Sequence, residues 1–168
     1  GLVGSEMCIR DRYVILVPYD RHGRLLTEEE AKPLIEYLEK HRKELESRRV
    51  VRLGKRRWYA YHENPPMREL LRPKILWKDI ARNPMFWADM KGEIIPRHNV
   101  YYLTPRSPEI IPDLLKYLNS EDVKEWLRAN CQRAANGYLR LQATVLKNLP
   151  IPDDLYLKGL GLRNLEVI

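Results

Sequence analysis

The sequence has little cysteine and no long apolar run, and each shortage excludes a class of protein. Cys8 and Cys131 are the two cysteines among 168 residues. Two thiols without a spacing pattern do not make a disulfide framework or a zinc site with paired cysteine ligands. Such usage suits a reducing compartment, so we expect a cytoplasmic protein. Apolar runs stay well short of the roughly 20 residues that a membrane-spanning helix needs, so we expect no membrane partner.

Motifs that carry chemistry are also scarce. The four histidines are dispersed along the chain, which predicts no metal site. Serine, histidine and acidic residues form no recognisable catalytic grouping, and none of the glycines forms a phosphate-binding loop between a strand and a helix. We therefore expect neither a catalytic residue nor a metal ligand in this chain.

Positive charge is what the sequence has in excess. Lysine and arginine total 30 against 23 aspartates and glutamates, which gives a net charge of +7 and a pI near 9.4. This imbalance favours a polyanionic partner, either nucleic acid or an acidic membrane face. Charged residues at 32% beside 44% hydrophobic residues are ordinary for a globular protein. The length allows one domain that can bury a sizeable core.

Cations and aromatic rings are concentrated between Lys55 and Ile80. This stretch reads KRRWYAYHENPPMRELLRPKILWKDI and includes an apolar run at residues 75–77. Nucleic-acid surfaces combine cations that neutralise phosphates with rings on which bases stack. The alternative is a basic loop exposed to water that leads into a core strand.

Several segments of the chain, in one order, resemble a known family. RPKILWKDI (72–80) is preceded by RRWY (56–59) and followed by a strand-like run at 85–88. Three further segments fit the same order: LIEYLEKHRKELESR (34–48), YYLTP (101–105) and LKNLPIPD (146–153). Together they resemble the TaqI-like C-terminal specificity domain of adenine-specific DNA methyltransferases. The resemblance covers most of residues 13–153.

This resemblance implies a target recognition module that binds double-stranded DNA and carries no chemistry of its own. The methyltransferase domain, with its S-adenosylmethionine, would precede residue 13 and is missing from the chain. Gly159 and Gly161 have no predicted helix after them, as a loop for that cofactor would require. Residues 64–66 begin like the loop by which amino-methyltransferases grip an extruded base, but Met67 stands where that loop needs an aromatic ring.

The sequence predicts an α+β fold: a small twisted sheet, mixed or antiparallel, flanked by one N-terminal and two C-terminal helices. Residues 1–12, GLVGSEMCIRDR, resemble translated sequencing-adapter read-through and are expected to be a non-native leader. Residues 13–153 would form the DNA target recognition domain. The leucine-rich residues 154–168 are broken by glycines and are expected to be a loosely attached or truncated tail.

Local patterns predict the individual elements. Thr27 and Glu30 match a capping box, but Pro33 limits it to a single turn at 28–31, so the main helix is expected from Pro33 to Glu46. A second helix is expected at 108–119, and Ser120 would cap a third. The predicted strands are at 13–19, 58–61, 73–80, 85–88, 93–95 and 99–103, with a hairpin or strand pair at 138–149.

Ten residues are predicted to bind DNA, because cations are rarely buried without a partner. Trp58 and Tyr59 suit the core as well as a contact, since neighbouring strand residues face opposite sides. Trp77, Trp87 and Trp126 are expected in the core. The predicted DNA-binding residues are Lys55, Arg56, Arg57, Tyr59, Lys74, Lys78, Arg82, Arg97, Arg133 and Arg140.

Two other functions fit parts of the sequence. Pro112 and Asp113 with Asp122 and Lys124 match the written pattern of a PD-(D/E)xK nuclease. That chemistry needs its carboxylates and lysine to converge on Mg²⁺ from a sheet, whereas these residues are predicted on helices. The other alternative is a basic protein-interaction module whose charge only keeps it in solution.

Overall fold

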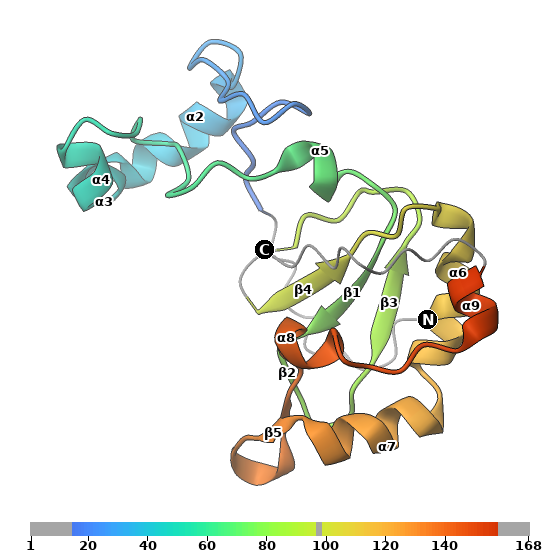
Figure 1. Ribbon diagram of the computed structural model, residues 1–168. Helices are drawn as coiled ribbons and strands as arrows, with labels where there is room; N and C mark the ends of the chain where they lie inside the picture. The colour runs from blue at the N-terminus through green and yellow to red at the C-terminus, as the bar shows by residue number, and fades with distance from the viewer. Residues whose placement is uncertain (1–14, 97–98, 158–168) are drawn as a thin grey trace. The chain divides into compact units, whose positions relative to one another are not determined.

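The computed structural model describes residues 15–96 and 99–157, which form two compact units divided between Met67 and Arg68 (Figure 1). The α+β class is confirmed, because the described part of the chain contains two small antiparallel sheets of three strands each and several helices.

Two predicted boundaries fall outside or at the end of the described residues. The predicted leader, residues 1–12, lies outside them, and so does most of the predicted tail. The helix α9 (Asp153–Leu157) crosses the expected start of that tail. Leu155 of α9 is only 6% exposed and belongs to the main core.

The helices of the N-terminal unit lie where the amphipathic pattern predicted a helix. Pro33 occupies one of the first two positions of the first of these helices, where proline is tolerated. A 3-10 turn interrupts the predicted helix in its middle. The segments are α2 (Lys32–Leu38), the 3-10 turn η1 (Glu39–His41), α3 (Arg42–Ser47) and then α4 (Arg49–Arg52).

The predicted strand at 58–61 is wrong. Trp58 and Tyr59, 6% and 4% exposed, both pack with Ile35 of α2 in the core of the N-terminal unit. The guanidinium of Arg48 donates hydrogen bonds to the carbonyl oxygens of Trp58 at 2.5 Å and Ala60 at 3.0 Å. A side chain thus takes the place of a neighbouring strand, and the segment forms a turn in which both rings can point inward.

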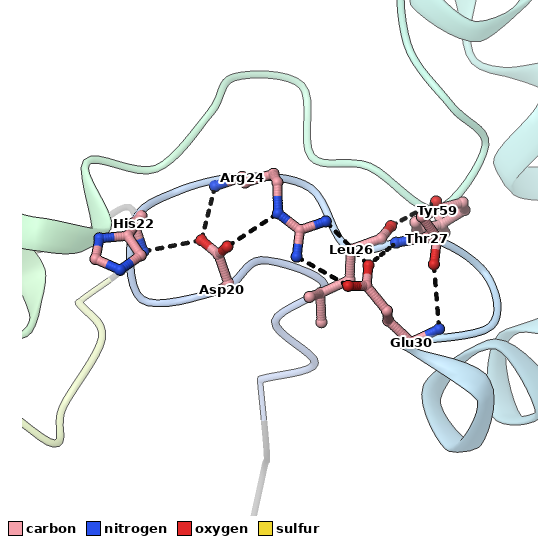
Figure 2. A network of polar contacts seen from close by, with 7 residues as sticks. All are labelled: Asp20, His22, Arg24, Leu26, Thr27, Glu30 and Tyr59. Carbon is pink, nitrogen blue, oxygen red and sulfur yellow. Dashed lines mark hydrogen bonds and ion pairs between the residues drawn. The ribbon is translucent and has the colours of Figure 1, made fainter.

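The predicted capping box is confirmed and forms part of a polar network (Figure 2). Glu30 accepts a hydrogen bond from the Thr27 amide at 2.8 Å, and the Glu30 amide donates to the Thr27 hydroxyl at 3.2 Å. Arg24 donates two hydrogen bonds to the Glu30 carboxylate and one to Asp20. The bonds from Arg24 lower the pKa of Glu30 to about 2.

Residues 13–14 of the predicted first strand are not described, and the rest forms only the bridge between Tyr19 and Leu25.

The larger sheet of the C-terminal unit has the order β3-β1-β4. Its strands are β1 (Lys74–Lys78), β3 (Phe86–Asp89) and β4 (Val100–Leu103), which confirms three of the predicted strands to within a few residues. Ile75 and Trp77 of β1 lie on the face that packs against the helices and are 0% and 2% exposed. The predicted strand at 93–95 is wrong, because the amides of Glu93 and Ile94 donate to the Asp89 carboxylate and not to a strand.

The smaller sheet has the order β2-β6-β5 and joins segments far apart in the sequence. Its strands are β2 (Ile80–Ala81), β5 (Gln132–Arg133) and β6 (Leu139–Arg140). The expected hairpin at 138–149 is therefore only half correct, since β6 pairs with strands outside it. Residues 143–146 form the short helix α8, whose Ala143 and Leu146 are buried one helical turn apart.

The two predicted C-terminal helices are confirmed; the first packs against β3 and β1 of the larger sheet, and the second packs against the first. They are α6 (Ile111–Leu118), preceded by the 3-10 turn η2 (Pro108–Ile110), and α7 (Glu121–Asn130) (Figure 1). Ile111, Leu114 and Leu127 are at most 1% exposed and form the centre of the core. Trp126 packs against this core but is only half-buried, contrary to its expected place in the interior. The remaining helices are the single turns α5 (Met67–Leu70) and η3 (Ala135–Gly137).

Ser120 caps α7 as predicted, since its hydroxyl accepts a hydrogen bond from the Val123 amide at 3.3 Å. Replacing Ser120 by alanine is expected to lower the free energy of unfolding by about 1 kcal/mol, because one amide of the first turn loses its partner. Urea unfolding followed by circular dichroism measures this change. Ser120→Asp keeps an acceptor at the cap and should retain the stability, so equal losses in both variants would contradict the capping role.

No helix in the two described segments is long and apolar enough to span a membrane.

Candidate nucleic-acid interface

The smaller sheet brings together cations that the sequence places far apart. Arg133 of β5 lies opposite Leu139, next to Arg140 of β6, and Arg82 follows the end of β2 directly. Lys78 ends β1 one residue before Asp79, which leads into β2. Lys78, Arg82 and Arg133 are exposed, and Arg140 is partly exposed. Four of the ten predicted residues are therefore grouped at or beside this sheet.

Three more predicted cations form a separate group in the N-terminal unit. Lys55 and Arg57 are exposed, and Arg56 is half-buried. Arg56 donates a hydrogen bond to the Asn64 side chain at 2.6 Å, which orders its guanidinium without neutralising it. None of the ion pairs formed among the described residues involves any of these three cations. Their charges remain available for a polyanion.

Lys74 does not fit its predicted role at the DNA surface. Its side chain is 0% exposed, and its ammonium donates to Asp89 at 2.5 Å and to the Leu70 carbonyl oxygen at 2.7 Å. Burial alone would raise the pKa of Asp89, but the bonds from Lys74 and from two backbone amides outweigh it and hold the pKa below its ordinary value. Lys74 is thus the rare cation that is buried because it has a partner, and it anchors the loop after β3.

Tyr59 is also a core residue and not a ring exposed for stacking. Its hydroxyl donates a hydrogen bond to the Leu26 carbonyl oxygen at 2.7 Å (Figure 2). Burial raises the pKa of the Tyr59 phenol. The ring ties the turn before α2 to the residues after α4. Arg97, the tenth predicted residue, lies outside the described residues.

Sequence reasoning missed three residues that lie beside the predicted cations of the smaller sheet. Ile80 and Gln132 are directly opposite Arg140 on its two sides, and both are exposed. The Asp79 carboxylate lies 3.6 Å from the Arg140 guanidinium. No local signal in the sequence could have found them, because the pairing of β2, β6 and β5 depends on the folded chain.

The residues of the nuclease pattern lie on helices, as expected. Asp113 is in α6, Asp122 is in the first turn of α7, and Lys124 pairs with Glu121 of the same turn. Among the described residues, no group of three or more histidines, cysteines or acids is placed to hold a metal ion. The geometry that Mg²⁺-dependent cleavage needs is therefore not formed by these residues.

The chain matches a known protein family over most of its length. Residues 11–151 match the TaqI-like C-terminal specificity domain. The chain is similar to the type II methyltransferase M.BanIII of Aneurinibacillus aneurinilyticus, with 39% identity over 70% of this chain and 21% of the relative. It is also similar to M.BstVI of Geobacillus stearothermophilus, with 25% identity over 83% of this chain and 24% of the relative.

The type II methyltransferase M.PaeR7I of Pseudomonas aeruginosa is 27% identical over 82% of this chain and 24% of its own length. The chain thus spans about a quarter of the length of the curated relatives that it matches. The matched region includes both described units and both groups of cations. The chain belongs to the TaqI-like C-terminal specificity domain family, and the relatives that it matches are type II methyltransferases.

Proposed function

We propose that this chain is the DNA target recognition module of a site-specific adenine-N6 methyltransferase in a restriction-modification system. The observation that carries the proposal is the family match over residues 11–151, which covers most of the chain. The module binds duplex DNA and positions it for a methyltransferase domain that supplies the chemistry. That domain holds the S-adenosylmethionine, and the complete enzyme acts in the cytoplasm.

The charges of the described residues support this role. Five cations form no ion pair with an acid in the part of the chain that the structure describes: Arg56 and Arg57 in the N-terminal unit, and Lys78, Arg82 and Arg133 in the C-terminal unit. Such cations neutralise phosphates, which positions a protein on the duplex without reading its sequence. Polar groups that face base edges then supply the discrimination.

Salt dependence tests whether the Arg56 group contacts phosphates. Replacing Arg56 and Arg57 together by alanine is expected to flatten the slope of log affinity against log salt by up to about two units, because each phosphate contact contributes roughly 0.9. Affinity for unrelated duplexes should fall by the same factor as affinity for any preferred duplex. Fluorescence anisotropy at several salt concentrations measures both quantities.

A matched variant separates a contact from a mere change in net charge. Lys32 and Lys43 are exposed residues of α2 and α3, and neither forms an ion pair with another described residue. Their double replacement by alanine removes the same two charges and should leave the slope nearly unchanged. If the two double variants flatten the slope equally, the phosphate contacts do not lie at Arg56 and Arg57.

A gel shift on random duplex DNA, with and without Mg²⁺, distinguishes the proposed function from the alternatives. Retarded intact DNA in both conditions is the expected result. Cleavage that requires Mg²⁺ would show a nuclease. A folded chain that retards no duplex at low salt would contradict DNA recognition and favour a protein-interaction module.

A further inference from the structure

The register of the smaller sheet places three different side chains abreast on one face. Ile80 and Gln132 lie on either side of Arg140, each directly opposite it in an antiparallel pair. Opposite residues point to the same face of a sheet, with Cβ atoms roughly 5 Å apart. The alternate row contains Leu139, which is 6% exposed and part of the core. The row centred on Arg140 therefore faces away from the core.

The backbone around Arg140 is held firmly. The Leu141 amide donates to the Asp79 carbonyl oxygen at 2.6 Å, and the Asp79 amide donates to the Asn99 carbonyl oxygen at 2.9 Å. The Trp77 indole also donates to the Leu141 carbonyl oxygen at 2.9 Å. These bonds join the end of β1 to the residue after Arg140. Side chains built on such a frame keep a fixed direction, as base reading requires.

The Asp79 carboxylate orients the Arg140 guanidinium without using up its donors. Arg140 Nη2 lies 3.6 Å from Asp79 Oδ2, close enough for attraction but too long for a good hydrogen bond. Arg140 Nε and Asp79 Oδ1 are buried, and neither has a hydrogen-bond partner among the described residues. The Arg140 side chain nevertheless remains 42% exposed, against 13% for Asp79. The Asp79 carboxylate thus attracts one side of the Arg140 guanidinium, while the outer edge of the guanidinium stays exposed.

The environment of Arg140 differs from that of the other cations at or beside the smaller sheet. Lys78, Arg82 and Arg133 are exposed and form no ion pair with an acid in the described segments. An acid beside a cation, as Asp79 is beside Arg140, reduces the local positive potential. It would therefore weaken the attraction to phosphate of a cation whose role is only to neutralise it. A planar guanidinium held in one direction can donate two hydrogen bonds to a pair of acceptors such as O6 and N7 of guanine.

We infer that Arg140 reads a guanine in the major groove of the target duplex, and that Asp79 is the positioning residue that aims it. The inference rests on the proposed function and goes further, since it assigns one residue to one base. Gln132 and Ile80 flank it with an amide and an apolar group, which match an adenine edge and a thymine methyl. Three abreast side chains span roughly 10 Å, close to the width of the major groove, which is about 12 Å.

The test selects preferred sequences with the full chain. A duplex pool with a random centre is bound, recovered and sequenced for the wild type and for Arg140→Lys, which keeps the charge. We expect the wild type to require a guanine at one position, and Arg140→Lys to lose roughly tenfold or more of that discrimination while its salt slope is unchanged. Arg133→Ala is the matched phosphate variant and should weaken all duplexes equally.

Asp79→Asn tests the positioning role. It should reduce the same guanine discrimination while affinity for unrelated duplexes stays constant or rises, because one acid near the phosphates is removed. A merely structural role would lower the melting temperature and both affinities together. The melting temperature of each variant is measured beside its affinities.

Other outcomes overturn the inference in distinguishable ways. If Arg140→Lys keeps the full guanine preference, or if the wild type binds duplexes with salt dependence but no base preference, Arg140 is a phosphate contact and DNA binding still stands. If the folded wild type binds no duplex at all, the proposed function fails together with the inference.

Discussion

Replacing Lys74 by methionine is expected to lower the free energy of unfolding by about 3 to 5 kcal/mol, because it leaves the Asp89 carboxylate buried without its cation. Asp89 is 6% exposed, so water cannot replace the lost ammonium. The two backbone amides that still donate to Asp89 keep the loss toward the lower end of that range. Urea unfolding followed by tryptophan fluorescence measures the change.

Lys78→Met provides the control on the same strand. Lys78 is exposed, and an exposed substitution changes stability by about 0.5 kcal/mol or less. Equal losses in the Lys74 and Lys78 variants would contradict the role of the buried ion pair.

The pH dependence of the Lys74 variant has a definite sign. In the wild type the pKa of Asp89 lies below its ordinary value of 3.8. The pair therefore stabilises the fold above pH ~4, and this contribution is lost as the pH falls through the folded-state pKa. Without Lys74 we expect the pKa of Asp89 to be higher than in the wild type, because the hydrogen bond and the charge that lower it are lost, so protonation of Asp89 costs the variant less. The difference in stability between the two proteins should shrink below pH ~4, and a difference that grows there would contradict this assignment.

The second large effect is expected at Gly92. Its φ of +68° is a left-handed conformation, and a Cβ there would lie 2.1 Å from the Leu71 carbonyl oxygen. Gly92→Ala adds the cost of a left-handed residue, about 1 to 2 kcal/mol, to that of displacing a backbone atom, about 1 to 3 kcal/mol. We expect a loss of roughly 2 to 5 kcal/mol in urea unfolding.

Gly137 is the matched control for the clash. Its φ is +76°, but a Cβ at this position would meet no atom within 4 Å. Gly137→Ala should therefore show the conformational cost alone. If both variants lose the same stability, the loop after β3 moves away from Leu71 readily, and the anchoring role that we assign to Asp89 is weaker than its contacts indicate.

The elements predicted correctly depend on residues close together in the sequence. The amphipathic spacing of Ile111, Leu114 and Leu118 predicted α6, and Ser120 predicted the start of α7. The β-branched and aromatic runs around Trp77 and Tyr102 predicted β1 and β4. Helical periodicity and capping are local properties, so the linear sequence is enough to detect them.

The wrong predictions have a common physical cause. Residues 58–61 and 93–95 have strand-like composition, but the first segment is bonded by the Arg48 side chain and the second by Asp89. A strand needs a partner, and composition cannot show whether one is present. The prediction that placed Lys74 at the surface was wrong for the same reason, because nothing near Lys74 in the sequence identifies Asp89 as its partner.

The sequence by itself determined the family, the excess of positive charge and the two C-terminal helices. Each of these follows from residue types and short spacings. Only the tertiary structure decided which cations are available to a polyanion, because exposure depends on contacts between distant segments. Burial removed Lys74 and Tyr59 from the surface, and the pairing of β2 with β6 placed Arg140 beside Asp79 and between Ile80 and Gln132. Long-range pairing determines the direction of a side chain, and this direction separates a base reader from a phosphate contact.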